Sequence, residues 1–152
     1  MEARGFSKSD FAKSHPAGQL GKKLTTLVKD LAVMNEMAPM VSQSTSLKDA
    51  LLEVTEKKLG VTLVSNNKKI VGIFTDGDLR RCLNDGVDLN STLIKDVMTS
   101  NFKGIKCNAL AIDAAEIMEK NKIFSLAVHS STNNKNNLGV ITMHQLLEAG
   151  II

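Results

Sequence analysis

The chain contains two copies of one sequence pattern, separated by 64 to 67 residues. Residues 47–54 (LKDALLEV) align with residues 111–118 (AIDAAEIM), so that an aspartate and the apolar positions of one helical face coincide. Residues 71–75 (VGIFT) align with residues 138–142 (LGVIT) in the same way. Solenoid units run about 20 to 50 residues and occur in long arrays. Two copies of this longer period therefore predict a tandem pair of similar domains.

Each copy reads as strand, helix, strand, strand, helix. In the first copy, Ser46 and Asp49 have the spacing of a capping box at the start of a helix with apolar residues at i, i+3, i+4 and i+7, and Gly60 is expected to end that helix. The fold class is therefore α+β, with a small sheet and two helices in each domain. The other expected elements are leading strands at 40–41 and 105–106, a hairpin of strands at 61–64 and 70–75, and second helices at 76–84 and 143–149.

The domain boundaries follow from the repeat. The first domain is expected over 28–90 and the second over 91–152. Residues 1–27 show no sustained apolar period, and we interpret them as a linker that is poorly ordered alone. Residues 130–137, which are rich in Asn and Ser, are predicted to be a hairpin loop.

Composition excludes several classes of protein. No apolar run approaches the roughly 18 residues that span a bilayer, and the N-terminal segment lacks the apolar core of a signal peptide. The net charge is only +3, and the chain has five Phe but no Trp or Tyr, which disfavours nucleic-acid binding. Cys82 and Cys107 form no disulfide framework, and we expect reduced thiols in the cytoplasm.

The best candidate site is the segment Thr75–Asp78 at the start of a helix. A helix N-terminus attracts phosphate oxygens, and a carboxylate at Asp78 can accept hydrogen bonds from both hydroxyls of a ribose. Gly77 lets a ligand approach the backbone closely. The alternative is that Thr75 and Asp78 are only a capping box, which any helix can use.

Other polar residues carry weaker signals. His129 and His144 have no Cys or acidic residue at a metal-ligand spacing, so no metal site and no cofactor is predicted. Arg80 and Arg81 are adjacent on a helix and point about 100° apart, so at most one of them faces the site. Cys82 is expected to be a buried, inert thiol.

Specific strings carry a family resemblance. Residues 14–24 (SHPAGQLGKKL) and 72–81 (GIFTDGDLRR), with the two β-α-β-β-α units, resemble the C-terminal half of bacterial arabinose 5-phosphate isomerases. Those enzymes join an N-terminal sugar isomerase (SIS) domain to a tandem pair of cystathionine-β-synthase (CBS) domains. The resemblance implies a CBS pair.

The resemblance also implies a nucleotide site. In CBS domains the Thr/Ser-x-x-Asp pattern grips ribose and phosphate, and the start of the second strand in the opposite repeat adds phosphate contacts. Gln145 stands where the second copy would have the ribose-binding Asp, so one good site per pair is expected. The nucleotide-binding residues implied in this way are Thr75, Gly77, Asp78, Arg80, Lys122, Ser125 and Thr142.

The implied function is regulation of an isomerase that interconverts ribulose 5-phosphate and arabinose 5-phosphate on the route to Kdo, a sugar of lipopolysaccharide. The expected effector is the nucleotide sugar CMP-Kdo, with CMP, AMP and ATP as other options. The alternative is an assembly module without a ligand. A homodimer is expected in either case, with a tetramer as an option for the full-length enzyme, because the second helices carry many apolar residues (Leu79, Cys82, Leu83, Met143, Leu146 and Leu147).

No catalytic centre is expected within the chain. In the family, a histidine in the segment that resembles residues 14–16 completes the isomerase site, so His15 would act only in the full-length enzyme. Without the SIS domain no partner base or phosphate clamp is available to it. Met1 is followed directly by sequence from the middle of the family, so we expect either an excised piece or a natural truncation of a longer protein, with excision favoured.

Overall fold

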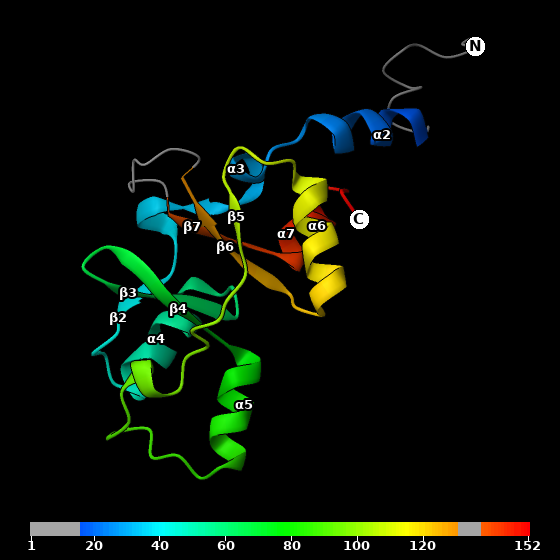
Figure 1. The fold of residues 1–152 in the computed structure, drawn as a ribbon. Helices are drawn as coiled ribbons and strands as arrows, with labels where there is room; N and C mark the ends of the chain where they lie inside the picture. The colour runs from blue at the N-terminus through cyan, green and yellow to red at the C-terminus, as the bar shows by residue number, and fades with distance from the viewer. Residues whose placement is uncertain (1–15, 131–137) are drawn as a thin grey trace.

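Two small β-sheets form the centre of the molecule, and each repeat supplies most of one sheet (Figure 1). The computed structural model describes residues 16–130 and 138–152. The strand order is β2-β3-β4 in one sheet and β1-β7-β6-β5 in the other. The strands are β1 (Val33–Met34), β2 (Met40–Ser42), β3 (Val61–Asn66), β4 (Lys69–Thr75), β5 (Gly104–Lys106), β6 (Ser125–His129) and β7 (Gly139–Thr142).

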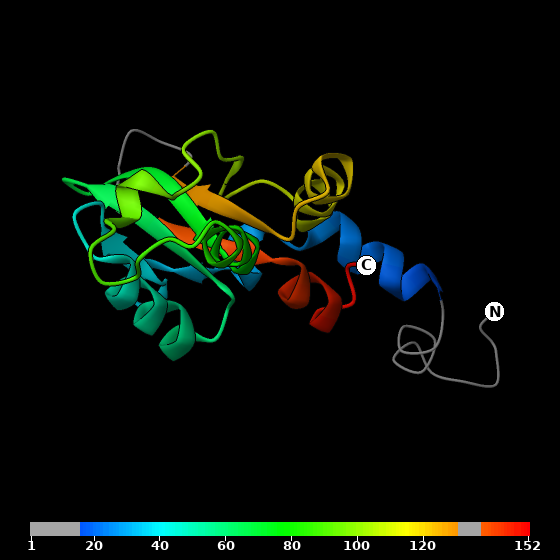
Figure 2. The ribbon, with the colours of Figure 1, turned by 90° about the horizontal axis from the view of Figure 1, so that it is seen from below.

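Helices cover the two sheets (Figures 1 and 2). In each repeat, one helix follows the leading strand and a second follows the hairpin, so the predicted β-α-β-β-α order and the α+β class are confirmed. The helices are α2 (Pro16–Thr25), α3 (Val28–Leu31), α4 (Leu47–Lys57), α5 (Asp76–Asn84), α6 (Ala111–Asn121) and α7 (Met143–Glu148), with short 3-10 turns η1 (Asn35–Met37) and η2 (Ile94–Asp96).

Local signals account for most helix ends. Ser46 accepts a hydrogen bond from the backbone N–H of Asp49 at the start of α4. That helix ends before Gly60, because Lys58 adopts the left-handed conformation (φ 60°) that ends a helix, and Gly60 follows with φ 71°. Complete capping boxes begin α5 at Thr75 and α7 at Thr142, as the repeated Thr predicts.

The two repeats exchange their first elements. Val33, which precedes the strand β2 of the first repeat, pairs with Val140 in the sheet of the second repeat. Thr99, which precedes β5 of the second repeat, pairs with Ile73 at the edge of the first sheet. The packing follows the same rule, since Val28 lies in the core of the second repeat and Ile94 in that of the first. The segments 28–34 and 94–99 therefore tie each repeat to the other.

A third apolar cluster lies between the two sheets. It contains Leu63 and Ile73 from the first sheet and Ala127 and Val140 from the second, all buried. Removing apolar surface of this kind from water stabilises a protein by roughly 25 cal/mol per Å². This shared cluster and the exchanged segments make the two repeats one packed unit.

Residues 16–25 form the helix α2, although no apolar period predicted it; its end is held by the hydroxyls of Thr25 and Thr26, which donate to the carbonyls of Gly21 and Lys22. His15 and the loop residues 131–137 lie outside the described residues. None of the helices in the described part of the chain is long and apolar enough to cross a membrane.

Candidate functional site

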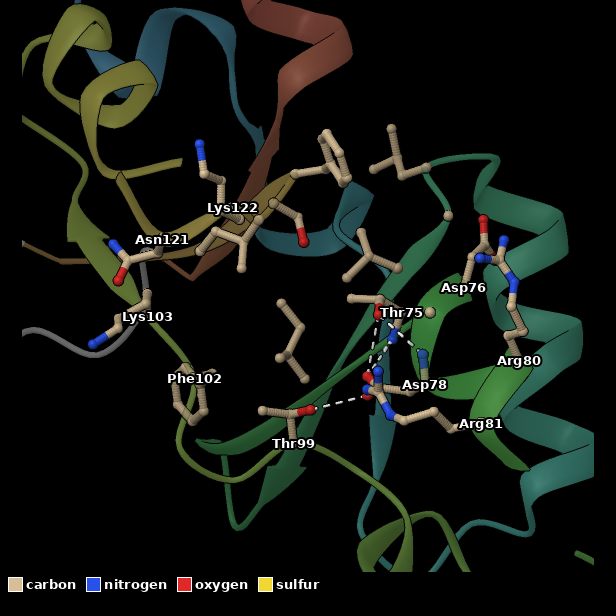
Figure 3. A pocket seen from close by; sticks show the side chains of 18 of the residues that line it. Thr75, Asp76, Asp78, Arg80, Arg81, Thr99, Phe102, Lys103, Asn121 and Lys122 are labelled. Carbon is tan, nitrogen blue, oxygen red and sulfur yellow. Dashed lines mark hydrogen bonds and ion pairs between the residues drawn. The ribbon is translucent and has the colours of Figure 1, made fainter. Parts of the chain in front are cut away.

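A cavity of about 630 Å³ opens between the start of α5 and the turn that joins α6 to β6 (Figure 3). The segment 99–103, which links the repeats, forms a third side. Apolar residues from the ends of β3 and β4 form part of the lining. The polar and charged residues that line the cavity are Thr75, Asp76, Asp78, Arg80, Arg81, Thr99, Asn101, Lys103, Asn121, Lys122 and Ser125.

The capping box of α5 fixes one oxygen of Asp78. The Oδ2 atom of Asp78 accepts hydrogen bonds from the backbone N–H of Thr75 at 2.9 Å and from its hydroxyl at 3.2 Å. In return, Thr75 Oγ1 accepts from the backbone N–H of Asp78 at 3.4 Å. The sequence pattern therefore forms the predicted helix cap.

The other oxygen of Asp78 has partners outside the cap. Its Oδ1 atom accepts a hydrogen bond from the hydroxyl of Thr99 at 3.0 Å and forms an ion pair with the guanidinium of Arg81. Figure 3 shows these groups meeting at the wall of the cavity. Only 4% of Asp78 is exposed. Four donor groups thus use the acceptor positions of a buried carboxylate.

Gly77 lies on the cavity wall beside this network. A β-carbon at this position would meet only Thr75 Oγ1 at 3.6 Å and Arg81 at 4.0 Å, which are ordinary contact distances. The packing of the protein therefore does not require glycine here.

The opposite wall comes from the second repeat. Lys122 ends α6 in the left-handed conformation (φ 57°), and Ser125 begins β6. Between them, Phe124 exposes 73% of its surface. Lys103 lies on the linking segment and lines the same cavity. Four cationic side chains (Arg80, Arg81, Lys103 and Lys122) and two carboxylates (Asp76 and Asp78) therefore line the cavity, which favours an anionic ligand.

The structure brings six of the seven predicted site residues together. Thr75, Gly77, Asp78, Arg80, Lys122 and Ser125 all line the cavity. Thr142 does not line it; its side chain caps α7 and only 5% of the residue is exposed. Thr99 was missed, because a pairing between a linking segment and β4 leaves no local sequence signal. Both arginines line the cavity, although adjacent positions on a helix predicted that only one would face it.

The corresponding position in the second repeat is built differently. Gln145 replaces Asp78 and accepts a hydrogen bond from the backbone N–H of Thr142 through Oε1 at 2.9 Å. Val33 pairs with Val140 as Thr99 pairs with Ile73, so a methyl group replaces the hydroxyl. Glu148 stands three residues after Gln145, where Arg81 follows Asp78. The asymmetry predicted from one residue thus extends to three.

Nearby titratable groups fit a structural role. Burial raises the pKa of the Cys82 thiol, and the carboxylates of Asp78 and Asp85 raise it further, while Arg81 lowers it. Cys82 and Cys107 are both free and buried. His144 contacts Glu148 at 3.4 Å on the exposed face of α7. No group of three His, Cys, Asp or Glu within the described ranges can hold a metal ion.

Two stretches of the chain, residues 28–85 and 94–151, match the CBS domain family. The chain therefore belongs to the CBS domain family, as a tandem pair. Two solved structures have the same fold. CBSX2 in complex with AMP is 24% identical with a TM-score of 0.67 and covers 83% of this chain and 96% of its own. The CBS domain protein PAE2072 from Pyrobaculum aerophilum, complexed with AMP, is 17% identical with a TM-score of 0.69 and covers 79% and 89%.

The chain is also similar to a particular enzyme. It is 45% identical over 153 aligned positions to the arabinose 5-phosphate isomerase KdsD of Yersinia pestis. The match covers 100% of this chain and 46% of that enzyme, so the chain spans about half the length of this relative. The resemblance predicted from residues 14–24 and 72–81 is confirmed.

Proposed function

We propose that the chain is the regulatory part of an arabinose 5-phosphate isomerase and that its cavity binds a nucleotide or nucleotide sugar. The observation that carries the proposal is that one cavity holds both a buried carboxylate and several cationic side chains. A buried carboxylate, Asp78, lies on one wall, and cationic side chains from both repeats line the same cavity. A ribose hydroxyl pair suits a carboxylate, and phosphate oxygens suit the cations.

Each of the six predicted residues that line the cavity has a role in this proposal. Thr75 holds Asp78 at the start of α5, Asp78 accepts the ribose hydroxyls, and Gly77 leaves room for the ligand beside the backbone. Arg80 and Lys122 attract the phosphate from opposite walls, and Ser125 can donate a hydrogen bond to it. The AMP complexes of CBSX2 and PAE2072 support a nucleotide in a fold of this kind.

The effector we favour is CMP-Kdo. The full-length isomerase would interconvert ribulose 5-phosphate and arabinose 5-phosphate, and a product of the route to Kdo would report on its flux. This nucleotide sugar has a ribose for Asp78 and two anionic groups, a phosphate and a carboxylate, for the cations of the cavity. CMP, AMP and ATP share the ribose and the phosphate and are the competing ligands.

Calorimetric titration of the chain with CMP-Kdo, CMP, AMP and ATP tests the proposal. Saturable binding of at least one of them is expected, and Gly77→Leu should weaken it strongly by placing a bulky side chain on the wall beside Asp78. The matched control is Gly86→Leu, at a glycine with nothing within 4 Å of its β-carbon position and outside the cavity. Since Gly86 has φ 69°, this control is expected to lower stability but not affinity. No binding of any of the four ligands by a folded chain would contradict the proposal.

A second candidate function is assembly without a ligand, and exposed leucines favour it. Leu83 on α5 and Leu147 on α7 expose 59% and 56% of their surface. The rest of the apolar surface expected on these helices is not available, because Cys82 and Leu146 are buried and Leu79 and Met143 pack against the cores. A homodimer through α5 and α7, and a tetramer of the full-length enzyme, remain part of this proposal.

A further inference from the structure

We propose that Arg81 is an exchangeable partner of Asp78, which moves from the carboxylate to the ligand's phosphate when a ribose binds. The inference rests on the proposed function, since it describes how the same cavity selects its ligand. It assigns Arg81 a role in specificity that differs from that of its neighbour Arg80.

The two oxygens of Asp78 differ in how easily they can change partner. Oδ2 is held by two donors of Thr75, one residue at the beginning of the same helix. Releasing it would open the cap of α5. Oδ1 is held by Arg81 and Thr99, which lie outside the cap. A ribose diol can therefore reach the carboxylate only by replacing a donor at Oδ1.

Arg81 is the donor that can leave. Its side chain is 69% exposed, whereas that of Asp78 is 5% exposed. Only the carboxylate of this ion pair is buried, and the guanidinium keeps its contact with solvent when it turns away, so the arginine loses little by leaving. Thr99 is fixed by backbone hydrogen bonds with Ile73 of 2.8 and 3.0 Å, so only its hydroxyl can rotate. Arg81 also lines the cavity, where a bound phosphate would lie within reach of a long side chain.

Because of the exchange, the contributions of the ribose diol and of the phosphate to binding affinity depend on each other. A ligand that has the diol but no phosphate must separate Arg81 from Asp78 and offers the arginine no new partner. A ligand that has a phosphate but no diol leaves Arg81 on Asp78. A ligand with both groups satisfies the carboxylate and the guanidinium together. The cavity is therefore expected to select ribonucleotides over both nucleosides and inorganic phosphate.

The test compares CMP with cytidine, and AMP with adenosine, on the wild-type chain and on Arg81→Met. NMR titration measures the weak nucleoside binding and calorimetry the nucleotide binding. In the variant, affinity for the nucleoside should rise about two- to fivefold, because the diol no longer competes with an ion pair, while affinity for the nucleotide falls. Arg80→Met is the matched comparison. It should lower the affinity for the nucleotide without raising the affinity for the nucleoside. Arg81→Gln gives a second variant if Arg81→Met is unstable.

The outcomes separate the two proposals. If the wild-type chain binds no nucleotide, the proposed function fails and the exchange fails with it. If nucleotides bind but Arg81→Met shifts both affinities in the same direction, or shows no nucleoside binding, the exchange alone is overturned. Opposite shifts in the two affinities support it, since a merely structural role of Arg81 would weaken both.

Discussion

The hydroxyl of Thr99 donates a hydrogen bond of 3.0 Å to Oδ1 of Asp78, across 21 positions of sequence. Thr99 lies on the segment that enters the second repeat, and Asp78 lies in the first turn of α5 in the first repeat. The bond joins the link between repeats to the wall of the cavity. Stability and ligand binding are therefore expected to share this contact.

Replacing Thr99 with Val removes the hydroxyl and keeps the shape of the side chain. The free energy of unfolding should fall by about 1 to 2 kcal/mol, because a hydrogen bond to a buried charge is lost. Denaturant unfolding measures it, with Thr55→Val on the exposed face of α4 as the control. An unchanged midpoint of denaturant unfolding for Thr99→Val would show that this hydrogen bond to Asp78 does not contribute to stability.

Asp78→Asn is expected to lower both stability and nucleotide affinity. From the sequence alone, this change keeps size and helix capping and is expected to change the melting temperature of the empty protein little. In the structure, donors face both oxygens of Asp78, Thr75 on one side and Arg81 and Thr99 on the other, so the NH₂ of an asparagine would meet a donor in either orientation. The loss in unfolding free energy should be about 1 to 3 kcal/mol.

The affinity of Asp78→Asn for nucleotide should fall about ten- to a hundredfold, as expected for the loss of charge-assisted hydrogen bonds. Calorimetry at a temperature where the variant is folded measures it. Reduced stability with unchanged affinity would make Thr75 and Asp78 a helix cap only and would favour the assembly function.

Gln145→Asp should not create a second nucleotide site. From sequence alone, restoring the carboxylate is expected to strengthen binding. In the structure, the new carboxylate would lack a threonine at Val33 and would have Glu148, not an arginine, three residues later. Calorimetry should show an unchanged number of sites, with a lower melting temperature. Adding Val33→Thr and Glu148→Arg should recover the lost stability.

The oligomeric state tests whether the exposed leucines of α5 and α7 form an interface between two copies of the chain. We expect a two-fold symmetric dimer, and Leu83→Glu with Leu147→Glu should reduce its mass to that of a monomer in light scattering. Leu24→Glu is the control, since this leucine of α2 is exposed to a similar degree, 60%. A wild-type chain with the mass of a monomer at all concentrations would contradict the expectation.

Asp88 gives a pH-dependent prediction away from the cavity. A hydrogen bond from the backbone N–H of Asn90, and one from the hydroxyl of Ser91, lower the pKa of Asp88 below the ordinary value of an aspartate. Stability from this carboxylate is therefore present above the unfolded pKa and is lost as pH falls through the lowered one. NMR titration should show the pKa rising in Ser91→Ala, while Ser100→Ala, also exposed, leaves it unchanged.

Sequence periodicity was sufficient for the repeated elements and for one wall of the site. The hairpins and the second helices lie close to where the apolar pattern and the capping residues predict them, because these signals act over a few residues. The exchanged segments 28–34 and 94–99 were not predicted, since their partners lie far away in sequence. For the same reason Thr99 and Lys103 were absent from the predicted site, although both line the cavity.

The exchange of first elements has a consequence for cutting the chain. A break near residue 90 would give two halves, each carrying a strand or turn that belongs in the other. Neither half would contain its own complete core, because Val28 would leave with the first half and Ile94 with the second. The halves are expected to fold only when they associate with each other, as two different subunits of one protein.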